Sequence, residues 1–319
     1  MALEMFIIAN TPNLWVTWFA YFAAVGIVSW LIGFPFSFLA FRIEKKFQLS
    51  RQNFKSWILD QFKAILVGTP LMGIALSGLL GCIYFFGAAW WWTAATLLIL
   101  FSVLLAQLAP ILLIPIFYPL KPMENGPLKE RLLALCSRYK VHVKEVYHLG
   151  MGEKTEKGNA AFVGLGRTKR ILIGDTLYEK FPVEEVEAVF AHELGHQVHN
   201  DLVKGLLLST FFIYLEFYLA SHFFSPIQLH LPQQALLFFV LIGLLQIPLS
   251  IFQILFSRDR ERKADQFAKE ILKSGKELAS ALERLTFQNW GYFQPNRWLE
   301  FFTYSHPAPW RRIQSLTHP

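Results

Sequence analysis

The sequence predicts a mainly α-helical protein that crosses a membrane about five times and carries a smaller part of mixed α and β structure. Three observations lead to this fold class. Apolar residues make up 54% of the 319 residues, and charged residues only 17%, which is too few for a soluble protein. Several long stretches have no charged side chain, as membrane-spanning helices require. All 30 Lys and Arg residues fall in three segments, 42–63, 119–204 and 257–319.

The first uncharged stretch runs from Met5 to Phe41. A helix of about 20 to 25 residues crosses a bilayer. We therefore expect a short apolar lead-in and one span, about Leu14 to Phe41, because two crossings would leave no room for a turn. Pro35 is expected to kink this span, since proline removes a backbone donor. The N-terminus lacks the basic region and the cleavage site of a signal peptide, so the stretch is expected to remain as a span.

Two further apolar stretches complete the predicted membrane part, the first without any charged side chain and the second with Glu216 as its only one. Residues 64–120 predict a helical hairpin with spans at about 64–86 and 91–118. Gly87 and the tryptophans at 90–92 mark its turn, and tryptophan is typical of the membrane interface. The last stretch, 205–257, predicts two more spans, interrupted near Ser225-Pro226 and Leu231-Pro232.

The distribution of positive charge predicts the orientation. Five spans place the three Lys- and Arg-containing segments on one side, and the short 42–63 loop is decisive because long domains follow the positive-inside rule poorly. We therefore expect the N-terminus outside, and the polar part and the C-terminus in the cytoplasm. The predicted location is a bacterial inner membrane, or the endoplasmic reticulum in a eukaryote. The net charge of +7 is explained by topology and by attraction to anionic lipid, so no nucleic acid is expected as a partner.

The polar segments predict a small α+β domain. Helices are expected at 127–139, at 259–274 and at 276–286. Another is expected to start at Pro182, with acids in its first turns, and to continue through residues 192–196 as the cytoplasmic extension of a span. Strands are expected at 143–149, 160–165 and 170–174, the last two as a hairpin across residues 166–169. The predicted division is a membrane domain at 1–120, a cytoplasmic domain at 121–204, two further spans at 205–257 and a second cytoplasmic segment at 258–319. This last segment is expected to complete the functional site that begins in 121–204.

His192-Glu193-Leu194-Gly195-His196 is the motif that carries chemistry. Residues four apart lie on one face of a helix, so His192 and His196 can bind one Zn²⁺ while Glu193 takes a proton from water. The alternative is two buried histidines that hydrogen-bond between helices beside a solvated Glu193. The context favours catalytic zinc, one ion per chain. His199 could be a spare ligand, although a place on the helix surface fits better because two histidines and one further ligand already satisfy zinc.

A zinc site of this kind needs a third protein ligand and one open position. Glu261 and Asp265, again four apart, follow the last predicted span. One of them could bind the metal while the other accepts a hydrogen bond from a ligand imidazole. Charge pattern alone favours a surface helix with ion pairs equally well.

The motifs taken together resemble the integral-membrane zinc endopeptidases of the CAAX prenyl protease type I family. The resemblance covers almost the whole chain from about residue 40. It rests on the following matches, in chain order: 42–47 through Phe54-Lys55, Asn159-Ala160, Lys169-Arg170-Ile171, Asp175-Thr176-Leu177, the histidine motif at 192–196, Ser257-Arg258-x-x-Glu261-x-x-Ala264-Asp265, and Tyr304-Ser305-His306-Pro307 with Arg312.

The resemblance implies a zincin-like metalloprotease domain and a role for each matched residue. It implies His192, His196 and Glu261 as zinc ligands, Glu193 as general base and Asp265 as the partner of a ligand imidazole. It implies that Asn159 and Ala160 hold substrate backbone at an edge strand, and that His306 and Arg312 stabilise the developing oxyanion or orient nearby groups. His306 is also expected to contact the substrate.

Three positions depart from the family pattern and affect substrate preference rather than zinc chemistry. The family usually has an aromatic residue where this chain has Ala161, a second proline where it has Ala308, and an acid where it has Arg311.

The function expected is hydrolysis of peptide bonds in membrane-associated or lipidated, CAAX-like substrates. The alternatives are a heat-shock-type quality-control metalloprotease and, less favoured because Glu193 is intact, a catalytically idle scaffold. Glu216, a charge inside a predicted span, either lines a polar cavity or pairs within the bundle. His222 and His230 are expected at the membrane interface. The sequence leaves the oligomeric state open.

Overall fold

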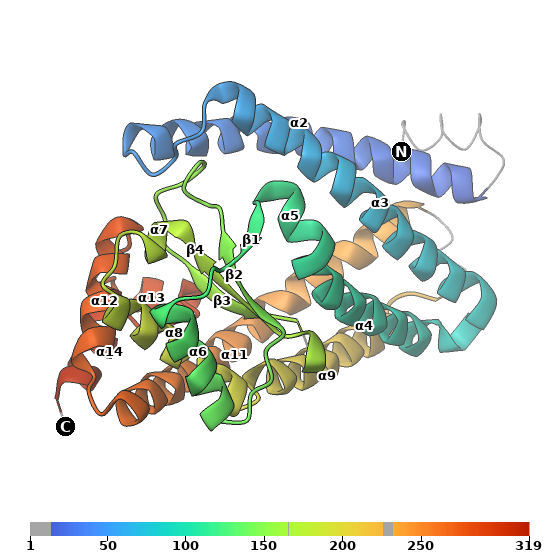
Figure 1. Ribbon diagram of the computed structural model, residues 1–319. Helices are drawn as coiled ribbons and strands as arrows, with labels where there is room; N and C mark the ends of the chain where they lie inside the picture. Colours follow the sequence, from blue (N-terminus) through green and yellow to red (C-terminus); the bar gives the residue numbers. More distant parts are fainter. Residues whose placement is uncertain (1–13, 165, 226–231, 319) are drawn as a thin grey trace. The chain divides into compact units, whose positions relative to one another are not determined.

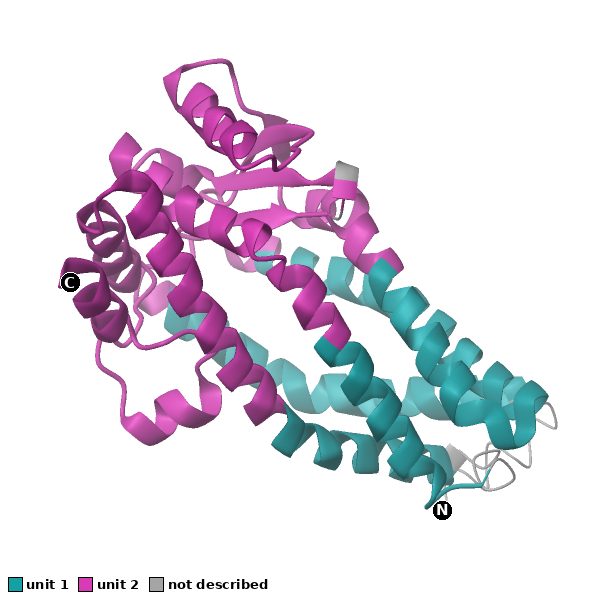
Figure 2. Cartoon of the chain, turned by 90° about the horizontal axis from the view of Figure 1, so that it is seen from below, with its two compact units in different colours: residues 1–44, 57–103, 208–249 teal, residues 45–56, 104–207, 250–319 magenta. Residues whose placement is uncertain are grey.

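The computed structural model describes residues 14–164, 166–225 and 232–318 and is mainly helical (Figure 1). The expected N-terminal lead-in, His230 and most of the interruption at 226–232 lie outside these residues. The chain forms two compact units (Figure 2). Unit 1 contains residues 1–44, 57–103 and 208–249, and unit 2 contains residues 45–56, 104–207 and 250–319.

Four helical stretches are long and apolar enough to cross a membrane among the described residues. One of them, Phe54–Phe117, reverses at a 3₁₀ turn and therefore contains two long helices. Gly87 makes that reversal possible because its φ of 51° is the left-handed conformation that glycine adopts without strain. The elements of these stretches are α2 (Leu14–Lys46), α3 (Phe54–Phe86), η1 (Gly87–Ala89), α4 (Trp90–Leu108), the π-helical η2 (Ala109–Leu113), α5 (Ile114–Phe117), α9 (Asp201–Ser221) and α11 (Pro232–Leu272).

A core of large aromatic and aliphatic side chains holds unit 1 together. Trp18, Leu80, Ile83, Trp90 and Phe238 are each 1–2% exposed. They come from α2, α3, α4 and α11, so helices far apart in sequence pack on one another. Outside this core, many large apolar side chains of the same helices are exposed, as expected for surfaces that meet lipid.

The predicted 42–63 loop is much shorter in the structure. α2 continues through Pro35 to Lys46, and α3 begins at Phe54, so most of the amphipathic sequence extends the two helices. The remaining connection, residues 47–53, belongs to unit 2 and is held there by contacts of Arg51. Arg51 N donates to Lys154 O at 2.9 Å, and the Arg51 guanidinium pairs with Glu156.

Unit 2 contains a four-stranded mixed sheet in the order β1-β2-β4-β3. β2 and β4 are parallel, whereas β1 and β3 are antiparallel to their neighbours. The β-hairpin expected across residues 166–169 is confirmed, with Ala160 opposite Ile173 and Val163 opposite Arg170. The strands are β1 (Leu120–Pro122), which sequence reasoning missed, β2 (Glu145–Leu149), β3 (Ala160–Val163) and β4 (Arg170–Gly174), with the short η3 (Gly166–Thr168) between the last two.

Helices cover this sheet and build the core of unit 2 (Figure 1). Ile171, Ile173, Leu177, Phe190 and Leu194 are each at most 2% exposed, so β4 and α8 form the centre. The helices are α6 (Pro127–Arg138), α7 (Asp175–Tyr178), α8 (Val183–Val198), α12 (Lys276–Gln288), α13 (Arg297–Thr303) and α14 (Pro309–Thr317).

Two helix boundaries differ from the sequence-based expectation. α8 and α9 are separate helices, because Asn200 adopts the left-handed conformation with a φ of 56°. The histidine motif is therefore not on a direct helical extension of a span. By contrast, the helix expected at 259–274 is no separate element, since α11 runs without a break from the last apolar stretch through Glu261 to Leu272.

Candidate active site

The histidine motif lies near the C-terminal end of α8, where one turn separates its two imidazoles. His192 is buried at 6% exposure, and His196 is half-buried. Their Nε2 atoms are 3.2 Å apart. Two imidazole nitrogens therefore converge on one point.

Glu261 on α11 supplies the third group at this point. One carboxylate oxygen lies 3.3 Å from His192 Nε2, and the other lies 3.3 Å from His196 Nε2. The carboxylate is 5% exposed, and its Oε2 atom is buried without a hydrogen-bond partner among the described residues. One donor atom from each of the three residues lies within 4.8 Å of the others, so the cluster could hold a metal ion.

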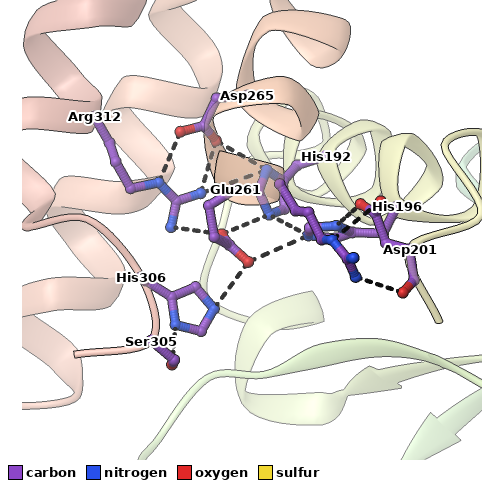
Figure 3. A network of polar contacts seen from close by, with 9 residues as sticks. His192, His196, Asp201, Glu261, Asp265, Ser305, His306 and Arg312 are labelled. Atoms are coloured by element: carbon purple, nitrogen blue, oxygen red, sulfur yellow. Dashed lines mark hydrogen bonds and ion pairs between the residues drawn. The ribbon is translucent and has the colours of Figure 1, made fainter. Parts of the chain in front are cut away.

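Asp265 and Arg312 form the back of the site (Figure 3). His192 Nδ1 lies 2.8 Å from Asp265 Oδ1, which makes the Nδ1–H tautomer favourable and leaves Nε2 as the free nitrogen. Arg312 from α14 donates two bonds to the Asp265 carboxylate, at 2.8 and 2.7 Å. A bidentate bond of this kind fixes the carboxylate in one plane.

His196 has a corresponding partner that sequence reasoning missed. Its Nδ1 lies 2.9 Å from Asp201 Oδ2, at the first residue of α9. Arg260 of α11 donates to the Asp201 backbone carbonyl at 2.6 Å, and its Nε lies 3.7 Å from Asp201 Oδ1. The only sequence signal is an acid five residues after the second histidine. A continuous helix would not bring that acid back to the imidazole, whereas the break at Asn200 does.

His306 lies on the open side of the cluster. Its Nε2 is 3.2 Å from Glu261 Oε1, its Nδ1 is 2.8 Å from Ser305 Oγ, and its side chain is 57% exposed. Glu300 steadies the turn that carries His306, because its carboxylate accepts a hydrogen bond from Ala308 N at 3.0 Å. Arg311, where the family usually has an acid, pairs with the same Glu300 at 3.4 Å.

The charges of the site shift one another's pKa values. Burial alone would lower the pKa of His192, but hydrogen bonds to Asp265 and Glu261 raise it to about 9. Burial disfavours the charged form of Glu261, yet the two histidines hold its pKa well below the usual range. The metal-free cluster therefore holds protons on imidazole and negative charge on Glu261.

Glu193 directly follows His192 on α8 and is half-buried. No hydrogen bond or ion pair holds its carboxylate among the residues that the structure describes. Burial raises its pKa, partly offset by the positive histidines. A carboxylate with raised pKa and no fixed partner is suited to accept and return a proton.

Asn159 and Ala160 lie at the start of the edge strand. β3 pairs with β4 alone within the described sheet, so its other edge is open. The Asn159 carbonyl accepts a hydrogen bond from Gly174 N at 2.8 Å, and its side chain is exposed. Phe162 of β3 contacts Phe190 of α8, with ring centroids 5.3 Å apart, so the strand packs against the motif helix. No contact in the described part of the chain joins Asn159 itself to the histidine cluster.

The remaining polar side chains singled out in the sequence lie away from the cluster. His199 caps the C-terminal end of α8 and contacts the Phe267 ring, with centroids 5.7 Å apart. His222 Nδ1 lies 2.9 Å from the Tyr218 carbonyl oxygen. Glu216 is 5% exposed, and its Oε1 atom has no hydrogen-bond partner among the described residues.

Known families match both parts of the chain. The model of peptidase family M48 matches residues 122–319, and the model described as the CAAX prenyl protease N-terminal part with five membrane helices matches residues 2–119. Within that second range, the described residues contain three long apolar helices, α2, α3 and α4. The matches confirm the resemblance that the motifs indicated.

Individual relatives agree with these matches. The uncharacterized metalloprotease YhfN of Bacillus subtilis is 24% identical over 91% of this chain and 71% of its own length. The probable CAAX prenyl protease 1 of Schizosaccharomyces pombe is 28% identical over 92% of this chain, which spans 64% of that relative. The crystal structure of S. mikatae Ste24p superposes with a TM-score of 0.84 at 25% identity, covering 94% of this chain and 75% of that one. The chain is an integral membrane protein and belongs to peptidase family M48, which makes it a metalloprotease.

Proposed function

We propose that this protein is a membrane-embedded zinc endopeptidase that cleaves membrane-associated, lipidated substrates of the CAAX type. The observation that carries the proposal is the convergence of His192, His196 and Glu261 in one buried cluster. Two relatives named CAAX prenyl protease 1, from Schizosaccharomyces pombe and Saccharomyces cerevisiae, support the substrate class.

The donor set and its spacing fit zinc. Two imidazoles and one carboxylate are the ligands of many catalytic zinc sites. Bonds of about 2.0–2.1 Å in a tetrahedron place ligand atoms about 3.3 Å apart. The two Nε2 atoms here are 3.2 Å apart, and each lies 3.3 Å from one oxygen of the Glu261 carboxylate, Oε2 for His192 and Oε1 for His196. The buried Glu261 Oε2 atom that lacks a hydrogen-bond partner is explained if a cation takes that place.

Zinc in such a site acts as a Lewis acid toward the scissile carbonyl and makes water more acidic. Glu193 takes the proton from the attacking water and returns it to the leaving amine. Asp265 and Asp201 hold the two imidazoles in the Nδ1–H tautomer. The open edge of β3, with Asn159 and Ala160 at its start, holds the substrate backbone as an added strand.

His306 and Arg312 have different roles in the proposed mechanism. His306 is exposed beside Glu261 and can donate a hydrogen bond to the oxyanion that develops on the substrate. Arg312 is 8% exposed, donates two bonds to Asp265 and lies 3.5 Å from Glu261 Oε2, so it orients the groups behind the site.

The finer architecture is part of the same proposal. It comprises five spans, a zincin-like catalytic domain in the cytoplasm, and an outer N-terminus. The Lys and Arg distribution supports this orientation, since the short segment 42–63, which contains the facing ends of α2 and α3, has six Lys or Arg and two acids.

A substrate comparison tests the function. Purified protein in lipid nanodiscs would be given a prenylated CAAX peptide, the same peptide without the lipid, and an unlipidated, misfolded membrane protein. Faster cleavage of the prenylated peptide than of its unlipidated match supports the proposal. Preferential cleavage of the misfolded protein indicates quality control instead. A zinc-loaded protein that cleaves none of the three is the outcome expected of an idle scaffold.

A further inference from the structure

The short helix α13 exposes almost all of its apolar side chains. Trp298 is 60% exposed, Leu299 42%, Phe301 36% and Phe302 51%. The Trp298 and Phe302 rings, one helical turn apart, stack with centroids 6.4 Å apart. Of the helix's seven residues, only Glu300 is buried. A soluble surface rarely gathers so many large apolar side chains on one element.

α13 is attached directly to α11. The Arg258 side chain donates to the backbone carbonyls of Glu300, Phe301 and Tyr304, with the last two bonds at 3.0 and 2.9 Å. These carbonyls are at the C-terminal end of α13, where the last carbonyls of a helix lack internal donors; the Glu300 carbonyl also accepts from Tyr304 N at 3.2 Å. A seven-residue helix is too short to be stable alone, so Arg258 determines where it lies.

Arg258 marks the level at which α11 leaves its apolar stretch. Phe252 is 62% exposed and Leu255 42%, as expected for side chains that face lipid. The charged run begins at Arg258, and Phe256 lies about 3 Å below it along the helix axis at 1.5 Å per residue. The aromatic helix is therefore fixed beside the apolar-to-polar boundary of a span.

A second exposed aromatic segment is attached beside another span. Trp290 is 60% exposed and Tyr292 69%. The Trp290 ring contacts Phe47, with centroids 4.9 Å apart, and Phe47 follows the last residue of α2. This contact is independent of Arg258, and it again places exposed aromatic side chains where an apolar helix ends.

We propose that residues 287–293 and 297–303, here called the aromatic belt, lie in the headgroup region of the bilayer. Tryptophan, tyrosine and phenylalanine on a short helix favour this region, because their rings are apolar and the indole and phenol groups can still reach water. Arg297 is exposed beside Trp298, with its guanidinium 5.1 Å from that ring, and can meet lipid phosphate. The Arg258 bond to Tyr304 extends the same anchorage to the turn that carries His306.

Spin-label accessibility tests this placement without any use of protease activity. Cys82 and Cys136 are buried, so after their replacement by alanine a single nitroxide can be attached at Phe302→Cys or at Trp290→Cys. Gln314→Cys on α14 is the matched control, since Gln314 is exposed on a polar helix of the same unit. Full-length protein in phosphatidylcholine–phosphatidylglycerol nanodiscs is then exposed to oxygen, which concentrates in lipid, and to a water-soluble nickel chelate.

Oxygen is expected to increase the spin relaxation of the nitroxides at 302 and 290 more than the nickel chelate does. At 314 the nickel chelate should have the larger effect. The proposal is overturned if both belt labels are as accessible to the nickel chelate as the label at 314. It is also overturned if they are shielded from both reagents, because protein, such as a second copy of the chain, then covers the belt. The readout is the same with or without bound zinc, so it is separate from the proposed enzymatic function.

Discussion

Gly195 and Ala264 meet where α8 and α11 pack together. A Cβ atom added at Gly195 would lie 3.1 Å from the Ala264 Cα and 3.1 Å from the Phe267 ring. This close approach lets Glu261, one turn earlier on α11, reach both His192 and His196. The glycine inside the histidine motif is therefore part of the metal site through packing, although it has no donor atom.

A larger residue at Gly195 should separate the ligands. Gly195→Val places an isopropyl group against the backbone of α11, and overpacking of this kind costs about 1–3 kcal/mol. We expect zinc affinity to fall about tenfold or more, measured by competition with a chelating dye. Gly243→Val on α11 is the control, because nothing lies within 4 Å of a Cβ there. Equal affinity in the Gly195 variant and the control would show that the close contact is not needed.

Glu261→Ala should leave the purified protein with little zinc. The change removes one of three ligands, whereas Asp265→Asn removes only the charge behind His192 and should weaken binding about 10–100-fold. Elemental analysis and metal competition would give both values. Glu270→Ala, at an exposed acid further along α11, is the matched control and should keep about one zinc per chain. Full zinc content in Glu261→Ala would place the third ligand elsewhere.

Asp201→Asn should weaken zinc binding by a similar factor of about 10–100, because Asp201 orients His196 as Asp265 orients His192. The nearby change Asp259→Asn, at an acid that pairs with Lys263, should have little effect. Retained affinity in Asp201→Asn would mean that the Nδ1 contact of His196 is incidental.

Zinc binding should release protons at neutral pH. Below about pH 9 His192 of the metal-free protein is protonated, because its pKa is raised to about 9, and only the neutral imidazole can bind metal. Affinity should therefore rise with pH up to about 9 and level off above it. Calorimetry at pH 7.5 in buffers of different ionisation enthalpy should show release of at least one proton. If the heat of zinc binding is the same in every buffer, no proton is released, and the raised pKa of His192 is contradicted.

Local spacing predicted the two pairs of side chains that converge in the site, whereas only the family resemblance chose Glu261 over Asp265 as the metal ligand. His192 and His196 are one turn apart on any helix, and Glu261 with Asp265 repeats that spacing. The uncharged stretches likewise predicted the long apolar helices. Both kinds of prediction depend on periodicity and composition, which are properties of neighbouring residues.

Long-range and backbone-dependent features could not be predicted in this way. Asp201 reaches His196 because the chain breaks at Asn200, and no hydrophobic pattern signals a single left-handed residue. Strand β1 contains only three residues and is defined by its pairing with β2. α11 runs without interruption through Ser257, where the composition changes from apolar to charged and the sequence pattern predicts a helix end.

Glu193→Gln is the sharpest test of zinc-dependent catalysis by Glu193, because it keeps the size of the side chain and removes its ability to take a proton. Glu184→Gln, at an exposed position of the same helix, is the control. Zinc content and cleavage of a prenylated CAAX peptide would be measured on the same preparations. We expect about one zinc per chain in both variants. Cleavage should fall by about 10²–10⁴-fold in Glu193→Gln and should stay unchanged in Glu184→Gln. Cleavage by zinc-loaded Glu193→Gln at the rate of the unchanged protein would contradict the account.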